Sequence, residues 1–520
     1  MWISIYLAMF GVCAAFYAWQ RRRSNPHRRP LPPGPKRWPF LSNIFQVPDP
    51  RDWKAHRRLS EKYGPIVYYE RFGKSTILIS SHELAVEFFE RRGQNYSDRS
   101  HNIVMGAELV GWNRAISLHP SGPRHSYYRK LLNNAVNPSA VRSLQATQEQ
   151  SAHRLLSRLL QTPDEWYHGV RSAISETLVQ ICFGRVCSTD EFPYITMAER
   201  SHQVFNSVAV ANAWAVDYLP FLKHLPEWLP GMGFKRLAKA WRAELDEFVY
   251  GPYNIVEADV NRGTAQPSYV ASLINAHGGT PNDEERDAIA WSSVSFFTGG
   301  IDTTIAAVTT FIMLMCLHPE VQHHVYEEML AVVGRERLPT LEDRAHLPYL
   351  SACIQEMFRM YPIVPLGVAK RANKDDYYGD YYIPADTTVV PNIWGMSHDP
   401  NIYESPESFI PERFLDPALG RSKPGFRSTR AFGFGRRVCP GRHLAEEMVF
   451  IHTACTVAAF ELSISRGQSG NANDSWEVEF VEGLITMPKP FTCTITPRMS
   501  GLAECLAHEA GLDGRPRSAG

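Results

Sequence analysis

The sequence lacks an excess of charge of either sign. Its 520 residues contain 54 Lys and Arg against 54 Asp and Glu, so the formal net charge is zero. A protein that holds nucleic acid by bulk electrostatics needs a basic excess, so this balance argues against a nucleic-acid partner. The chain also lacks internal repeats, and no low-complexity linker follows residue 50, which argues against a repeat architecture.

Paired cysteines are missing as well. The nine cysteines are odd in number and scattered along the chain. This arrangement argues against a disulfide framework and indicates a reducing compartment. It also leaves no second thiolate pair at zinc-finger spacing. No dinucleotide-binding glycine fingerprint precedes a βαβ pattern, so electrons for any redox chemistry must come from another protein.

An uncharged apolar run spans residues 2–19 and is followed by Arg21, Arg22 and Arg23. A cleavable signal peptide carries its positive charge before the apolar stretch, so this order favours a signal anchor. The positive-inside rule then places the rest of the chain on the cytoplasmic side. We expect four regions: an anchor over 1–20, a basic and proline-rich hinge over 21–50, a folded domain over 51–500 and a C-terminal tail over 501–520.

What the chain does contain is a cysteine in a loop rich in glycine and arginine, residues 432–441. Cys439 precedes a helical pattern over Arg442–Ala459, and helix N–H groups and guanidinium charges both lower the pKa of a thiol. The glycines allow a flat group to approach, so a lone thiolate here suits one axial ligand to haem iron. Two other interpretations stay open on these residues: a buried free cysteine in a glycine-rich turn, and a zinc site that uses Cys439 with His443.

The complete pattern Phe-x-x-Gly-x-Arg-x-Cys-x-Gly, from Phe432 to Gly441, resembles the signature of the cytochrome P450 family. Three further motifs occur in the family's order: Gly299-Gly300-Ile301-Asp302-Thr303-Thr304, Glu356-Met357-Phe358-Arg359 and Pro411-Glu412-Arg413-Phe414. The resemblance covers nearly the whole chain after the anchor. It implies the haem-thiolate fold, mainly α with a smaller β portion, and makes residues 51–500 the catalytic domain. We expect strands over 76–80, 377–383 and 387–390.

A long helical pattern runs over residues 285–317 and ends before Pro319. Its apolar residues cover most of its circumference, so it lies in a large core or spans a membrane, and Asp302 disfavours the span. Glycines at 299 and 300 cost about 1 kcal/mol each relative to alanine, which indicates a packing or functional reason. The resemblance implies that Thr303 hydrogen-bonds dioxygen at the iron and that Asp302 supplies protons.

The resemblance also assigns a cofactor, haem b, with Cys439 as the iron ligand. The haem carboxylates need cationic partners. The cofactor-binding candidates are Arg437, Arg129 in a helix expected over 126–135, Lys370, Phe432 and His125, which stands where the family commonly has Trp. A buried structural network is implied for Glu356, Arg359 and Arg413. The implied substrate-pocket residues, for each of which core packing is the alternative, are Phe296, Phe297, Thr298, Val364, Leu366, Leu484 and Ile485.

Within the cytochrome P450 family, the chain most resembles fungal microsomal members of the secondary-metabolism type. That likeness implies a monooxygenase that inserts one oxygen atom from O2 into a lipophilic terpenoid or aromatic substrate. Electrons would come from NADPH through NADPH-cytochrome P450 reductase, with cytochrome b5 as an optional donor, at the endoplasmic reticulum membrane.

Residues 218–241 could then contact the membrane interface. A basic surface would face the reductase, formed by Arg421, Lys423, Arg427, Arg430, Arg436 and Arg442. The alternatives are a haem-thiolate isomerase or peroxygenase without a reductase, and a non-catalytic haem sensor or carrier. The intact Asp302-Thr303 pair disfavours both.

Overall fold

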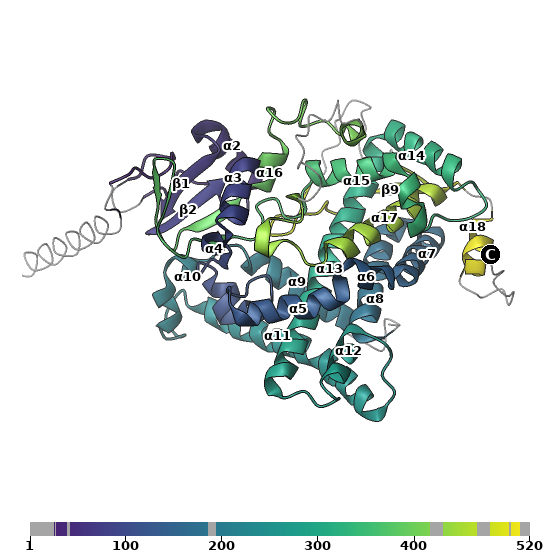
Figure 1. Cartoon of the computed structure of the whole chain (residues 1–520), viewed down its shortest axis with the longest axis horizontal. Coiled ribbons are helices and arrows are strands. Elements are labelled where there is room, and N and C mark those ends of the chain that lie inside the picture. Colours follow the sequence, from purple (N-terminus) through teal and green to yellow (C-terminus); the bar gives the residue numbers. More distant parts are fainter. Residues whose placement is uncertain are drawn as a thin grey trace, which may run out of the picture.

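The computed structural model is mainly helical, with the larger sheet at one end of the molecule and the strand β9 (Cys493–Pro497) among the helices at the other (Figure 1). It describes residues 25, 28–38, 42–185, 194–415, 430–464, 479–498 and 501–509. The expected anchor over 1–20 therefore lies outside the described residues. The described part of the expected hinge lies against the sheet, because the Tyr68 N–H donates to the carbonyl of Pro33 at 2.7 Å.

The α-helices follow one another along the whole chain. They are α2 (Trp53–Tyr63), α3 (His82–Val86), α4 (Gly93–Tyr96), α5 (Pro123–Val136), α6 (Pro138–Arg142), α7 (Gln145–Gln161), α8 (Trp166–Phe183), α9 (Tyr194–Val208), α10 (Ala215–Tyr218), α11 (Gly233–Arg262), α12 (Tyr269–Ala276), α13 (Asp283–Leu317), α14 (Pro319–Val332), α15 (Pro348–Met360), α16 (Ile393–Ser397), α17 (Arg442–Ala459) and α18 (Leu502–Glu509). The helices expected over 126–135, 285–317 and Arg442–Ala459 are confirmed as α5, α13 and α17.

The strands form one sheet and two smaller pairs. The sheet has the order β1-β2-β7-β4-β3, with β1 (Ile66–Arg71), β2 (Lys74–Ile79), β7 (Thr388–Pro391), β4 (Lys370–Arg371) and β3 (Asp98–Arg99). The pairs are β5 (Asp376–Tyr378) with β6 (Tyr381–Ile383), and β8 (Phe460–Ile464) with β9 (Cys493–Pro497). The strands expected over 76–80 and 387–390 are β2 and β7, which run parallel. The segment 377–383 is a hairpin that turns at Gly379, where φ is +55°.

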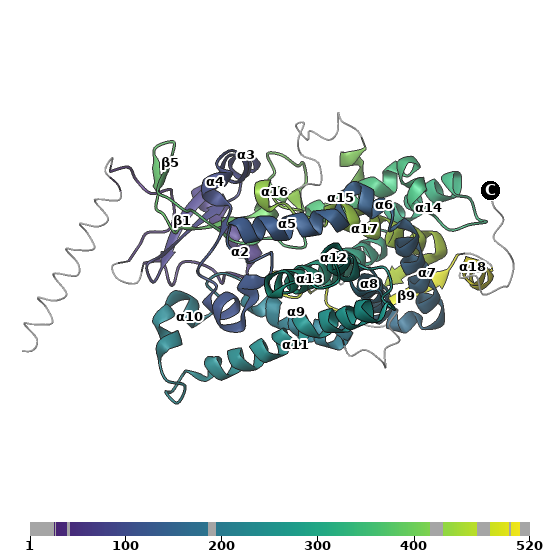
Figure 2. The same cartoon turned by 60° about the horizontal axis from the view of Figure 1, so that its bottom comes forward.

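Helix α13 is the axis of the helical part, with α5 on one side and α9 and α11 on the other (Figure 2). It starts at a capping box, in which Asn282 accepts from the N–H groups of Glu284 and Glu285. Among the described residues it is the one helix long and apolar enough to cross a membrane, but 83% of its apolar window is buried inside the protein. Helix α13 is therefore a core helix, and the alternative of a membrane span is wrong.

The three residues expected in a structural network come together in the interior. Arg359 of α15 binds Glu356 through two hydrogen bonds of 2.7 Å, and Arg413 lies 3.2 Å from the same carboxylate. Arg359 also donates to the carbonyls of Ser397, Pro406 and Ser408. The network thus connects α15 to residues 397–413, which precede the cysteine loop in the sequence.

Candidate functional site

A large cavity lies between α13 and the cysteine loop. It encloses about 1920 Å³ of atom-free space, its opening included. Cys439 lines it from the loop, and Asp302 and Thr303 line it from α13. Its apolar side chains come from α13, from the bend after α15 and from the turn at 483–485, so residues far apart in the sequence share one chamber.

The cysteine loop holds its sulfur against this cavity. Gly433 and Gly435 have φ values of +80° and +58°, which glycine adopts without strain, and a Cβ at Gly435 would overlap the carbonyl of Phe89. The Cys439 N–H donates to the carbonyl of Phe432 at 2.8 Å, which closes the turn. The Phe432 ring lines the cavity and lies 5.6 Å from the ring of Phe358.

Burial raises the pKa of the Cys439 thiol, whereas the Gly441 N–H and the Arg129 and Arg442 guanidinium groups lower it. Backbone N–H and guanidinium groups thus act on the thiol in the direction expected from the sequence, while burial acts against them and outweighs them. A buried sulfur of this kind becomes a thiolate when a metal cation binds it.

Four buried or half-buried cations line the cavity: Arg99 and Lys370 from β3 and β4, Arg129 from α5, and Arg437 from the loop. Burial, and then Arg99 and Arg437, hold the pKa of Lys370 far below its usual value. Burial likewise lowers the pKa of Arg437 to about 10. His125 stands among them, and burial followed by Arg437, Arg129 and Arg99 lowers its pKa to about 3. His125 is therefore neutral at pH 7.

Arg99 is a site residue that the sequence analysis missed. Its NH1 donates to the carbonyl of Val368 at 2.9 Å, and its buried Nε has no hydrogen-bond partner. It meets the cluster because β3 pairs with β4, with Arg99 opposite Lys370. The two strands are about 270 residues apart in the sequence, so no local pattern indicates the contact.

The residues present fit a haem. Its two carboxylates would form ion pairs or hydrogen bonds with side chains of the cluster: Arg99, Arg129, Lys370, Arg437 and the neutral His125. Cys439 would be the ligand of its iron. When bound, the haem supplies the activation of oxygen. No cluster of three metal-ligating side chains occurs in the part of the chain that the structure describes, so a zinc site at Cys439 and His443 has too few ligands there.

On the α13 side, Asp302 has partners that the sequence analysis also missed. Its Oδ2 lies 2.9 Å from His202 Nδ1 of α9, and its Oδ1 lies 3.6 Å from an Arg171 nitrogen of α8. Burial acts to raise the pKa of Asp302, but His202 and Arg171 outweigh it and hold the pKa below its usual value. Asp302 is therefore an ionised carboxylate at the cavity wall. Beside it, the Thr303 hydroxyl donates to the carbonyl of Gly299 at 2.7 Å.

Five of the seven expected pocket residues line this cavity: Phe296, Thr298, Val364, Leu484 and Ile485. Phe297 does not, because successive helix residues point about 100° apart. Its ring packs instead between Phe183 at 5.7 Å and Tyr194 at 5.1 Å. Leu366 lines a neighbouring chamber.

The basic surface expected around the loop is only partly described. Arg421, Lys423 and Arg427 lie outside the described residues. Arg430 is buried rather than on the surface, with its guanidinium 5.7 Å from the centre of the Tyr403 ring. Burial lowers its pKa to about 10. Arg430 therefore cannot contact a reductase as expected, whereas Arg436 is exposed.

The comparisons with known proteins agree with this geometry. The family model for cytochrome P450 matches residues 32–495. Cytochrome P450 monooxygenase 208 of Postia placenta is 34% identical over 500 residues, which cover 96% of each chain. Cytochrome P450 monooxygenase ppsD of Aspergillus oryzae is 33% identical, over 97% of this chain and 94% of its own. Monooxygenase claR of Ampulloclitocybe clavipes is 33% identical, over 92% and 88%. The chain therefore belongs to the cytochrome P450 family and is a monooxygenase of that family.

Proposed function

We propose that this monooxygenase oxidises a lipophilic terpenoid or aromatic compound in fungal secondary metabolism. The observation that carries the proposal is the largely apolar cavity between Cys439 and the Asp302-Thr303 pair. Apolar walls position a substrate mainly by shape and exclude water from it. We further propose that the electrons come from NADPH through NADPH-cytochrome P450 reductase, with cytochrome b5 as an optional donor.

Within this proposal, each polar residue of the cavity has a separate task. Cys439 would hold the iron, and the cation cluster would fix the haem through its carboxylates. Thr303 and Asp302 both line the cavity, and the Thr303 hydroxyl donates to the Gly299 carbonyl. Asp302 would take up a proton on its carboxylate, with His202 and Arg171 holding it in place, and pass the proton inward.

The proposal is tested by expressing the protein with a fungal reductase in yeast and feeding terpenoid and aromatic scaffolds. Mass spectrometry should find products heavier by one oxygen atom, with 18O from labelled O2, only when NADPH and reductase are present. Product formation without NADPH would favour an isomerase or peroxygenase. No product from a broad panel, despite a normal carbon monoxide spectrum, would favour a haem sensor or carrier.

We also propose that the protein is held at the endoplasmic reticulum membrane with its catalytic domain in the cytosol. Supporting this, β1 and α10 lie at the same end of the molecule (Figure 1). The segments next to them in sequence carry exposed large apolar side chains: Phe45 before β1 at 84%, and Phe221 and Trp228 after α10 at 57% and 78% exposure. Exposed aromatic side chains of this kind favour a membrane interface. Protease added to intact microsomes should digest the domain; protection of the domain would contradict this orientation.

A further inference from the structure

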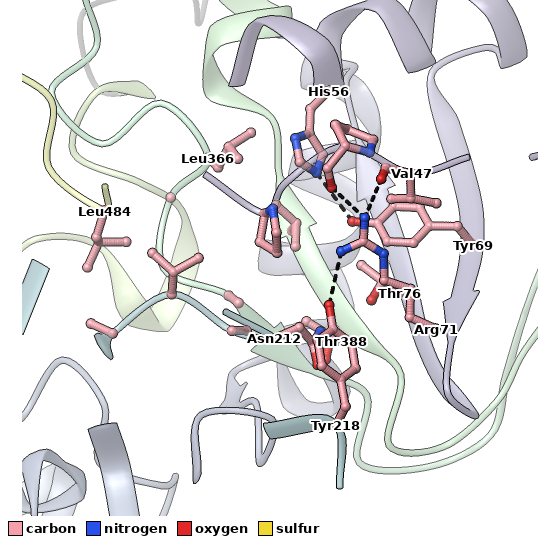
Figure 3. A pocket seen from close by; sticks show the side chains of 18 of the residues that line it. Val47, His56, Tyr69, Arg71, Thr76, Asn212, Tyr218, Leu366, Thr388 and Leu484 are labelled. Atoms are coloured by element: carbon pink, nitrogen blue, oxygen red, sulfur yellow. Dashed lines mark hydrogen bonds between the residues drawn. The ribbon is translucent and has the colours of Figure 1, made fainter. Parts of the chain in front are cut away.

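A second, smaller chamber adjoins the large cavity. It encloses about 660 Å³ of atom-free space, its opening included, and lies between β1, β2, β7, residues 209–218 and the turn at 483–484 (Figure 3). Gly367 and Leu484 line both chambers, so the two meet there. Most of its wall is apolar, and Leu366, Val390 and Leu484 are among its lining residues.

Among the polar residues of this wall is the cation Arg71, at the end of β1. Its guanidinium lies between Val47 and Tyr218 (Figure 3) and donates to the Pro48 carbonyl at 2.8 Å, to the Val47 carbonyl and to the Tyr218 hydroxyl at 3.1 Å. All three partners are neutral, and within the described ranges no carboxylate forms an ion pair with Arg71. Its Nε is buried without a hydrogen-bond partner. Asp49 interacts with Arg71 electrostatically at longer range, but its carboxylate is hydrogen-bonded to Arg51. A ligand anion would therefore form the first direct ion pair of Arg71 and offset the cost of burying its charge.

Tyr218 adds a second donor beside the first. Its oxygen accepts from Arg71, so its own proton remains free to donate, and no acceptor for it occurs in the described part of the chain. Burial raises the pKa of Tyr218 more than Arg71 lowers it, so the hydroxyl keeps its proton at neutral pH. A guanidinium N–H and a phenol O–H therefore lie side by side, which suits an oxyanion.

We propose that this chamber binds the carboxylate of a lipophilic acid, whose apolar body extends past Gly367 and Leu484 into the large cavity. The inference rests on the proposed function, because the acid is taken to be the substrate class of the same cavity. One cation and one phenol match the single charge of a carboxylate, whereas a phosphate dianion would be left half-neutralised. An acid held here would present its far, apolar end to the large cavity, while its carboxylate stays in the smaller chamber beside Arg71.

The test compares acids with alcohols of the same skeleton on the haem-loaded full chain. The probes are dodecanoate with 1-dodecanol and abietate with abietinol, titrated by calorimetry and by the change in haem absorbance. Arg71→Leu should raise the Kd of an acid by about 10-fold or more, the scale of a lost charge-assisted hydrogen bond, and change the Kd of its alcohol by less than about 3-fold. Arg71→Lys should retain most of the affinity, and Tyr218→Phe should raise the Kd of the acids by about 3- to 10-fold.

The matched control is Arg58→Leu, which removes a surface arginine whose side chain is 68% exposed and should change neither Kd. If Arg71→Leu weakens acids and alcohols equally, Arg71 only fastens the segment at Val47, and the proposal is overturned. Failure of both acids to bind the unaltered protein overturns it as well. The carbon monoxide spectrum and NADPH consumption of the same variants report on the proposed function separately, because neither depends on the difference between acid and alcohol.

Discussion

Cys439 is subject to opposing influences from its surroundings. Burial favours the neutral thiol, while Arg129, Arg442 and the Gly441 N–H favour the thiolate. Because the two tendencies oppose each other, binding of iron would decide the charge of this sulfur, rather than the protein alone. The same loop can therefore exclude water and still provide an anionic ligand.

Replacing Cys439 tests this assignment directly. Cys439→Ala should abolish the red-shifted absorbance band of the reduced carbon monoxide complex, because no other cysteine lines the cavity among the described residues. Cys182→Ala is the matched control, since it removes a buried sulfur from α8 away from the cavity. A red-shifted band in Cys439→Ala would contradict the ligation.

Thr303 and Thr310 allow a comparison along one helix. Both donate to a carbonyl four residues earlier, but only Thr303 lines the cavity. Thr303→Ala should keep the haem and its carbon monoxide band while product formation falls by about 10²–10⁴-fold, the usual contribution of a positioned proton donor. NADPH would still be consumed, with its electrons diverted to hydrogen peroxide.

NADPH, peroxide and product should be measured together for both variants. Thr310→Ala should leave the ratio of product to NADPH unchanged. An unchanged ratio in Thr303→Ala would remove this residue from the reaction.

At the scale of the element, the paired glycines of α13 have different surroundings. A Cβ at Gly299 would meet nothing within 4 Å, whereas one at Gly300 would lie 3.0 Å from a Leu178 methyl of α8. Gly299→Ala should raise the free energy of unfolding by up to about 1 kcal/mol through helix propensity. Gly300→Ala should lower it by about 1–3 kcal/mol because Leu178 must move. Urea unfolding of the two variants checks this, and equal values would contradict the packing account.

The link between α15 and the later segment depends on a buried carboxylate. Glu356 is fully buried and holds both Arg359 and Arg413. Glu356→Gln should lower the free energy of unfolding by about 3–5 kcal/mol, because buried guanidinium groups lose their counter-charge. Glu244→Gln, which breaks a surface pair with the 68%-exposed Arg200, should change it by less than about 1 kcal/mol. Similar losses in the two variants, measured by urea unfolding, would show that burial does not matter here.

In the whole molecule, buried histidines make the free energy of unfolding depend on pH. Burial, and then Arg154, lower the pKa of His452 to about 4, and a similar burial lowers that of His398 to about 4. In the unfolded chain these two histidines are protonated near pH 6.5, whereas in the native protein they are protonated only near pH 4. The free energy of unfolding should therefore fall as the pH is lowered through this window.

His452 alone should contribute a slope of about 1.4 kcal/mol per pH unit between pH 6 and pH 4.5. The ring bridges α7 and α17, with Nε2 3.0 Å from Ser151 Oγ and Nδ1 2.7 Å from the Met448 carbonyl. Urea unfolding at several pH values should show a shallower slope for His452→Gln. The control His323→Gln alters a side chain that is 64% exposed and should leave the slope unchanged. An unaltered slope in His452→Gln would contradict the account.

Features that arise from neighbouring residues could be predicted from the sequence. Pro319 and the polar residues at 282–285 bound α13, and the glycines of the cysteine loop together with Arg442 place Cys439 at the start of α17. These features depend on contacts within a few residues, such as caps, turns and helical spacing. Family membership and the mainly helical fold could be predicted for the same reason, because their motifs are short and continuous.

The groups that surround those motifs come from distant parts of the chain and could be identified only from the fold. His202 and Arg171 reach Asp302 from two other helices, and Arg99 reaches Lys370 through strand pairing. Phe297 and Arg430 were misplaced because burial depends on packing against segments that local spacing does not specify. The charge of Cys439 and the small chamber at Arg71 could not be predicted from the sequence either. Desolvation and cavity shape depend on elements that come into contact only in the folded chain.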